Sequence, residues 1–378
     1  MARGLWGASK AFIASCLYRE GKRPLLILCA GTQEGVDFWA ALSTFLREAA
    51  ILYFPPLPWG ERPSLQTRME RVLSLSDLLQ GSSQVMVVPL ASLSAPLPPP
   101  DSLRFSFLTL YPQRIIPPSQ LIAALLERGY RESPQVTEWG EFSRRGGVLD
   151  LFPPPAEHAV RVEFFGDEIV SLRSFDPNTQ RSIGRLEQVS IPPLDEEGWG
   201  SPPEREATLL DYFPRSPLIL LDEPDLLKRA WRELEKEEGR SIRPAWEEIL
   251  QDRVRLSLSS FHFPSLPEGI EQSISFETAG IASFQGKIPS FAEAAKQWGR
   301  EGYRLRLLCK SAGQAKRLQE ALKEYELHLS LEENFFSSSP LALLVGDLPS
   351  GFSLPELKLM VISEEEVFGG RPHEVPRP

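Results

Sequence analysis

The chain has 378 residues, which is more than one ordinary core needs and enough for two to four units of about 100 to 150 residues each. With 42% hydrophobic and 24% charged residues, the composition is that of a globular protein, which excludes wholesale disorder and a fibrous repeat. The formal charge of -10 argues against a chain-wide electrostatic footprint for nucleic acid, although a local basic face stays open. Protein partners are therefore favoured over DNA.

The few cysteines and histidines form no recognisable metal or disulfide site. Cys16, Cys29 and Cys309 are far apart, and the histidines are scattered as well. We therefore expect no metal, no cofactor and a reducing, cytoplasmic compartment. No apolar run approaches the roughly 18 residues of a membrane span. The segment that ends at Cys16 imitates a lipoprotein cleavage site, but Lys10 interrupts it, so we interpret it as an amphipathic helix.

From the start to about residue 100, predicted helices alternate with buried strands. Helices are expected over 8–19, 38–45 and 68–79, and strands over 24–29, 51–54 and 85–88. This alternation is typical of an α/β fold with a parallel sheet. The proline-rich run 95–100 then indicates a boundary.

The next hundred residues follow a different pattern. A strand is expected over 105–110 and a helix over 117–128, where prolines suit the first turn. A β-meander is then predicted, with strands over 141–152, 159–165, 168–175 and 181–191. This region is therefore expected to be a small α+β insert, followed by a polar linker around 196–203.

After the linker the α/β pattern resumes with a strand over 218–223, and a last unit starts near 278. In that unit we expect helices over 290–299 and 313–324 and strands over 304–309, 341–345 and 357–362. The predicted domains are one α/β domain in two parts, 1–100 and 197–277, the α+β insert 101–196, and an additional α/β domain with a tail, 278–378.

A degraded phosphate-binding motif stands before the first helix, at Gly7, Ser9, Lys10 and Ala11. A working loop needs Gly before the Lys, so that backbone N–H groups can wrap the phosphates, and Ser or Thr after it to hold magnesium. Ser9 and Ala11 take those two places, and no hydrophobic strand precedes the loop. The motif therefore lacks its magnesium ligand.

A second half-motif ends the strand 218–223 with Asp222 and Glu223. In nucleotide hydrolases such a strand carries a metal-holding Asp and a water-activating Glu. The structural alternative is that the two acids cap the following helix. The two half-motifs together indicate an NTPase fold that has lost its chemistry, and no other catalytic motif is present. We expect no enzyme, and ATP neither bound tightly nor hydrolysed.

The strand 159–165 alternates between apolar and charged residues. Odd-numbered residues go to one face and even-numbered ones to the other, which groups Arg161, Glu163 and Phe165. A phenylalanine beside charges suggests an interaction hot spot, and the alternative is that Phe165 packs under a helix in a two-sided sheet. On the preceding strand, Gly146-Gly147 is expected to form a bulge that spoils the face assignment of Arg145.

Distinctive motifs stand at residues 141–153, 161–169, 175–177 with 180–182, 351–352 with 354–355, and 359–369, and further similarity lies at 57–61 and in the helix around 68–75. These segments strongly resemble the N-terminal region of the bacterial transcription-repair coupling factors, Mfd. The excision-repair protein UvrB shares a less similar version of this region. UvrB lacks the C-terminal motifs that begin at Gly351, and this difference separates the two families. The resemblance covers nearly the whole chain.

The resemblance implies a degenerate RecA-like NTPase domain, interrupted by a domain that docks the damage-recognition ATPase UvrA. In the family the docking surface uses two arginines and a phenylalanine, and matching the motifs gives Arg145, Arg161 and Phe165. The family's RNA polymerase-binding module and DNA-translocating motor lie beyond the matched region. The chain is therefore expected to be an N-terminal fragment.

The expected function is that of a non-catalytic adaptor that recruits UvrA and links stalled transcription to nucleotide excision repair. One alternative is a UvrB-like nucleotide-dependent enzyme that remodels DNA or verifies damage, and Ser9 and Ala11 argue against it. Another alternative is a regulatory clamp, in which other parts of the full-length protein cover the docking surface. No residue of this chain tests the clamp.

Overall fold

The computed structural model describes residues 1–58, 63–81, 84–94, 97–194, 207–238, 249–250, 253–261 and 272–369, with the side chains of 104–105 left out. These residues form two compact units, one of 1–56, 81–94 and 215–378 and the other of 57–80 and 95–214. The expected linker 196–203 and residues 59–61 of the family match lie outside the described residues. The four expected domain ranges stay a proposal.

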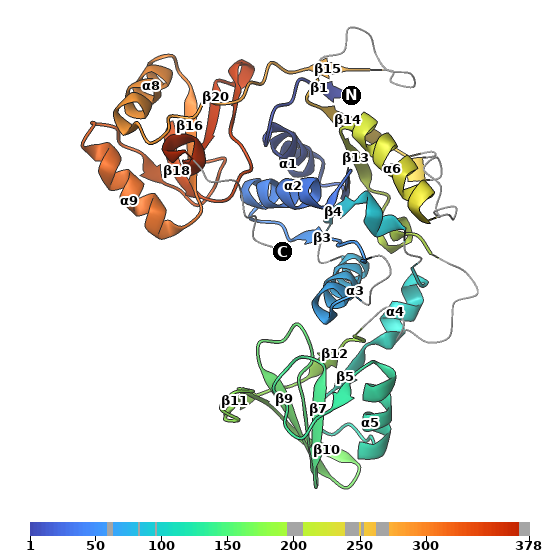
Figure 1. Ribbon diagram of the computed structural model, residues 1–378. Helices are drawn as coiled ribbons and strands as arrows, with labels where there is room; N and C mark the ends of the chain where they lie inside the picture. The colour runs from blue at the N-terminus through green and yellow to red at the C-terminus, as the bar shows by residue number, and fades with distance from the viewer. Residues whose placement is uncertain are drawn as a thin grey trace. The chain divides into compact units, whose positions relative to one another are not determined.

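The first unit contains a seven-stranded sheet of order β15-β1-β14-β13-β2-β4-β3 in which every pairing is parallel (Figure 1). Strands β2 and β4 are buried along their whole length, as expected for parallel strands covered on both faces. The strands are β1 (Ala2–Arg3), β2 (Leu25–Cys29), β3 (Ile51–Tyr53), β4 (Val85–Pro89), β13 (Leu218–Asp222), β14 (Arg255–Ser259) and β15 (Ile274–Ser275).

Helices follow these strands in the expected alternation. They are α1 (Ser9–Gly21), α2 (Thr32–Phe45) and α6 (Pro224–Glu238), with a short 3-10 helix η1 (Leu90–Leu93). The α/β class with parallel strands is therefore confirmed. Strand β1 precedes the loop before α1, but its two residues, Ala2 and Arg3, are too few to form a hydrophobic run.

A second sheet of the first unit has the order β17-β18-β16-β20-β19. The expected strand over 357–362 begins only at Leu359, because a 3-10 turn precedes it and ends at Lys358 with φ 47°. The elements are α8 (Ile288–Arg300), β16 (Arg304–Cys309), α9 (Ala312–Lys323), β17 (Ser330–Leu331), β18 (Leu341–Val345), β19 (Phe352–Leu354), η4 (Pro355–Leu357), β20 (Leu359–Ser363) and α10 (Glu364–Phe368).

An aromatic cluster joins the helices of the first sheet to the region of the second. Phe45 on α2 packs edge-on against Phe335 with ring centroids 4.7 Å apart, and Phe12 on α1 lies 5.7 Å from Phe352. The buried Arg306 fixes the chain around Phe335, since its guanidinium donates to three backbone carbonyls between residues 335 and 339. The two sheets of this unit therefore share one apolar core.

The second unit contains a six-stranded sheet of order β11-β10-β9-β8-β7-β6. Strands β7 to β11 pair antiparallel, and helix α5 packs on one face of them through Leu121 and Leu125 (Figure 1). The strands are β6 (Arg131–Glu132), β7 (Glu141–Arg145), β8 (Val148–Leu151), β9 (Ala159–Phe165), β10 (Glu168–Phe175) and β11 (Ser182–Arg185). The other elements are α3 (Leu65–Gln80), α4 (Pro100–Ser106), β5 (Leu108–Leu110), α5 (Pro118–Glu127), β12 (Val189–Ile191) and η3 (Leu209–Tyr212).

Three strand predictions in this unit are wrong in their bounds. The expected strand 141–152 is two antiparallel strands, β7 and β8. Residues 100–106 form helix α4 instead of the start of a strand, because a proline at its first turn and Asp101 favour a helix N-terminus. The expected strand 181–191 is two strands, β11 paired with β10 and β12 paired with β5.

The expected bulge at Gly146-Gly147 is also wrong. The two glycines form a two-residue turn, with Gly146 at φ 58°, and Arg145 stays in register with Val148. The register of this sheet shifts instead on β10, between Ile169 and Ser171 and again between Ser174 and Phe175. Arg145 can therefore be assigned to a face of the sheet. Among the described residues, no helix is both long and apolar enough to cross a membrane.

Candidate functional site

Backbone N–H groups of the loop between β1 and α1 donate hydrogen bonds to other segments of the same unit. A phosphate-binding loop works because such N–H groups are open to a ligand. Here the acceptors come from two distant segments of the same unit, around residues 278 and 350, and from the end of β14. The bonds are Leu5 N to Ser259 O (3.0 Å), Trp6 N to Thr278 Oγ1 (2.5 Å) and Ala8 N to Ser350 O (3.4 Å).

Gly7 is required by both its conformation and its surroundings. Its φ of 53° lies in the left-handed region, and a Cβ at this position would clash with Ser350 Oγ and approach the carbonyl of Gly351 to 3.2 Å. The segment Ser350–Gly351 therefore lies directly against the loop. The protein itself fills the space beside these backbone groups.

Ser9 and Ala11, which take the two altered positions of the motif, are both buried. Ser9 is the first residue of α1 and is fully buried, and its hydroxyl has no hydrogen-bond partner within the described part of the chain. Ala11 is 2% exposed and packs in the apolar core. Among the described residues no cluster of His, Cys, Asp and Glu is suited to a metal ion.

Lys10, Asp222 and Glu223 are brought together, as the two half-motifs predict. Lys10 Nζ lies 2.8 Å from Asp222 Oδ1 and 2.7 Å from Glu223 Oε1. Glu223 also accepts from Ser259 Oγ at 3.1 Å and from the backbone N–H of Ser260 at 2.7 Å. The two acids therefore form internal ion pairs with Lys10. This arrangement differs from the alternative that they cap the following helix.

Burial and pairing act against each other on these three groups. Burial lowers the pKa of Lys10, but the charges of the two carboxylates outweigh it, so the pKa is raised. Burial raises the pKa of Glu223, yet Lys10 and the bonds from Ser260 outweigh it and the pKa is lowered. For the more deeply buried Asp222, burial dominates and the pKa is raised despite Lys10. Lys10 is thus held in its charged form by the two carboxylates.

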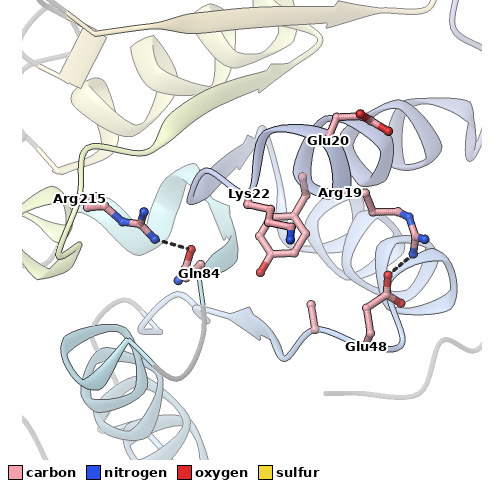
Figure 2. Close-up of a pocket in the computed structure, with 8 residues that line it drawn as sticks. Arg19, Glu20, Lys22, Glu48, Gln84 and Arg215 are labelled. Carbon is pink, nitrogen blue, oxygen red and sulfur yellow. Dashed lines mark hydrogen bonds and ion pairs between the residues drawn. The ribbon is translucent and has the colours of Figure 1, made fainter.

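A pocket of about 650 Å³ lies elsewhere in the first unit (Figure 2). It is lined by Tyr18, Arg19, Glu20, Lys22, Glu48, Ala49, Gln84 and Arg215. These residues precede or flank the amino ends of β2, β3, β4 and β13, whereas open α/β sheets bind ligands at the carboxyl ends. Arg19 pairs with Glu48, and Arg215 donates to Gln84 at 3.2 Å. The pocket is therefore not the nucleotide site.

The second candidate region is the sheet face of the second unit that points away from α5. On β9, Val160 and Val162 are buried in the core, while Arg161 and Glu163 are half-buried on the opposite face. Phe165 follows them on that face and is 80% exposed. The alternative that Phe165 packs under a helix is therefore wrong.

Arg161 is held in place on this face by two contacts. Its Nε and Nη2 donate to the two oxygens of Asp150, at 2.7 and 2.8 Å, and its guanidinium lies 4.8 Å from the centroid of the Phe175 ring. The hydrogen bonds that Arg161 donates to Asp150 are the main cause that raises the pKa of Arg161. Two of its three guanidinium nitrogens are therefore already used within the sheet.

Arg145 ends β7 and lies on the same face. It is exposed, and its Nη2 donates to the carbonyl of Pro134 at 2.7 Å. In the sheet register, Arg145 is opposite Val148, and Val148 is opposite Glu163. Glu163 lies between Arg161 and Phe165 on the same face of β9. The three residues taken from the family motif therefore share one sheet face.

Sequence reasoning missed the partners that position these residues. Asp150 stands opposite Arg161 in the register of β8 and β9, and the alternation of β8 was the only signal that could have found it. Thr278 and Ser350 lie more than 270 residues from the loop that they contact, and no local pattern marks them.

Comparison with known proteins gives two matching family models. Residues 108–196 match the UvrB interaction domain, and residues 302–367 match the MFD, D3 domain. The chain is 26% identical over 458 residues to a transcription-repair-coupling factor of Bacillus subtilis (strain 168), with 99% of this chain and 38% of that protein covered. A protein of the same name from Staphylococcus aureus (strain MRSA252) is 25% identical over 444 residues, covering 97% and 38%.

The chain thus spans well under half the length of the curated relatives that it matches. The resemblance to the transcription-repair coupling factors is confirmed, because two separate segments and the nearly full-length alignments point to the same proteins.

Proposed function

We propose that this chain is the non-catalytic, UvrA-recruiting part of a transcription-repair coupling factor and links stalled transcription to nucleotide excision repair. The observation that carries the proposal is the UvrB interaction domain at 108–196, one sheet face of which presents Phe165 with 80% of its surface exposed. RNA polymerase and DNA are proposed as partners of the full-length proteins only, through regions outside this chain.

The docking chemistry follows from Arg145, Arg161 and Phe165. An exposed phenylalanine offers a large apolar area at a small entropic cost, and aromatic residues with arginine dominate protein interfaces. Guanidinium groups present paired donors that suit carboxylates. The partner surface is therefore expected to combine an apolar depression with acidic residues beside it.

The first unit serves in this proposal as a scaffold of degenerate RecA-like type. The loop before α1 directs its N–H groups to Ser259, Thr278 and Ser350, and Lys10 is held between Asp222 and Glu223. Both features oppose nucleotide binding, since the phosphates would need the same donors. The second candidate function is a UvrB-like nucleotide-dependent enzyme, and the meeting of Lys10 with the two acids is the observation that favours it.

A binding titration between the 378-residue chain and purified UvrA tests the proposal. Phe165→Ala should weaken binding by about 30-fold, or roughly 2 kcal/mol, because a central anchor is lost. Phe261→Ala is the matched control, since Phe261 is 65% exposed but lies in the other unit, and its variant should stay within about twofold.

Two results would contradict the proposal: no binding by the wild-type chain, or equal losses in the Phe165 and Phe261 variants. Thermal melting of each variant serves as the folding control. An exposed phenylalanine should leave the melting curve nearly unchanged, whereas truncation of a buried one costs about 3 to 5 kcal/mol.

A further inference from the structure

Among the described residues, the two most exposed large apolar side chains are Phe165 at 80% and Ile115 at 77%. They are 50 positions apart in sequence, yet one residue of β10 connects them. Glu168 pairs with Phe165 across the hairpin turn and forms a bridge with Ile115 on its other side. The three residues therefore form one cross-strand row, which we call the Ile115 patch.

The exposure of Ile115 is set by backbone pairing. The N–H of Ile116 donates to the carbonyl of Asp167 at 2.8 Å, and the N–H of Ile169 donates to the carbonyl of Arg114 at 3.0 Å. These bonds fix Ile115 opposite Glu168, and directly opposed residues of an antiparallel pair point to the same face. The neighbours Ile116 and Ile169 are 5% and 0% exposed, which confirms that they point inward.

The patch continues the face that carries Arg145 and Arg161. Adjacent strands lie about 4.8 Å apart, so Ile115 and Phe165 are separated by about 10 Å, which is within the span of one hot-spot cluster. Glu168 stands exposed between them, and none of the ion pairs among the described residues involves it. Exposed Asp167 adds a second negative charge beside it.

We propose that Ile115 is a second apolar anchor of the docking surface and that Glu168 between the two anchors meets a cation of the partner. The occupant is the protein that binds Phe165, which is UvrA under the proposed function on which this inference rests. The surface is basic at Arg145, apolar at Phe165 and Ile115, and acidic at Glu168. A matching partner therefore offers a carboxylate to Arg145 and, beside it, two apolar contacts with a Lys or Arg between them.

A nucleic acid does not fit this surface. Its phosphates would lie against Asp167 and Glu168, both exposed and both acidic. A protein with mixed charges satisfies the whole row, which is why the proposal commits to a protein partner.

The test measures binding of purified UvrA to the full 378-residue chain carrying single substitutions. Ile115→Ala should weaken binding by about tenfold, and Glu168→Lys should weaken it at least as much, because it places like charges together. Ile183→Ala is the matched control, since Ile183 is 54% exposed in the same unit but lies on β11, which pairs with residues 173–175 at the other end of β10 from Glu168. It should stay within about twofold. Melting curves of the three variants should match the wild type, because surface truncations change stability little.

A double variant sharpens the result. If both anchors enter one partner surface, Ile115→Ala and Phe165→Ala should be non-additive by about threefold or more. If Phe165→Ala weakens binding while Ile115→Ala behaves like Ile183→Ala, this inference is wrong and the proposed function stands. If the wild-type chain does not bind UvrA, both fail.

Discussion

The cluster of Lys10, Asp222 and Glu223 and the outer face of the β7–β10 sheet both hold charged residues that the sequence singled out, but these residues have opposite surroundings. Lys10, Asp222 and Glu223 satisfy one another below the surface. On the sheet face, Phe165 is exposed, Arg145 is exposed with one hydrogen bond to the carbonyl of Pro134, and Arg161 is half-buried and paired with Asp150. Loss of one partner from a buried ion pair destabilises the folded chain. Exposed apolar area, in contrast, is available to a binding partner.

The largest effect is expected from Lys10→Met in the first region. The substitution leaves two buried carboxylates without a cation, which typically costs about 3 to 5 kcal/mol. Urea unfolding should give a free energy of unfolding that is lower by this amount. The control is Lys310→Met, since Lys310 pairs with Glu365 at 2.7 Å with its side chain 35% exposed and should contribute about 1 kcal/mol or less. Equal losses in the two variants would show that Lys10 is an ordinary surface cation.

The pH dependence of Lys10→Met gives a second prediction with a definite sign. In the wild type the pKa of Glu223 is lowered, so its contribution is present above its ordinary value of 4.5 and is lost as pH falls through the folded value. Burial already raises the pKa of Asp222, and without the opposing charge of Lys10 that pKa should rise further. The folded variant should then bind protons more tightly than the unfolded one and regain stability as pH falls from 7 toward about 5. An unchanged deficit at both pH values would exclude the carboxylates as its source.

Local sequence patterns predict more of the sheet face than of the loop before α1. Local alternation places Arg161 and Phe165 on one face, because strand periodicity is a property of consecutive residues. Whether that face is covered depends on distant elements, and so the exposure of Phe165 could not be decided. The hydrogen bonds from the loop before α1 to Thr278 and Ser350 span more than 270 residues of sequence, and no periodic pattern predicts such contacts.

On the sheet face, Arg161→Ala should weaken UvrA binding by about 2 kcal/mol and also lower stability by about 2 kcal/mol, since a partly buried Asp150 loses two charged hydrogen bonds. The double variant Asp150→Ala/Arg161→Ala removes both partners and should recover stability but not binding. Recovery of binding together with stability would show that Arg161 only positions the sheet.

A smaller effect is expected for Arg145→Ala, about 1 to 2 kcal/mol in UvrA binding without a change in the melting curve. Arg144 provides the control, because it is equally exposed and adjacent but is paired with the buried Leu149, which assigns it to the other face. Binding curves for Arg144→Ala should stay close to the wild type. A larger loss for Arg144 than for Arg145 would reverse the face assignment.

The smallest effect, close to zero, is expected for nucleotide. A ligand present at 100 times its Kd would stabilise the chain by about 2.7 kcal/mol, which a melting curve detects easily, so magnesium and ATP at millimolar concentration should leave the curve unchanged. The double variant Ser9→Gly/Ala11→Ser separates two reasons for this. If only the missing motif residues prevented binding, the variant would gain a magnesium-dependent shift. Because the loop donors already serve Ser259, Thr278 and Ser350, we expect no shift in the variant either. A shift in the wild-type chain would instead favour the UvrB-like enzyme.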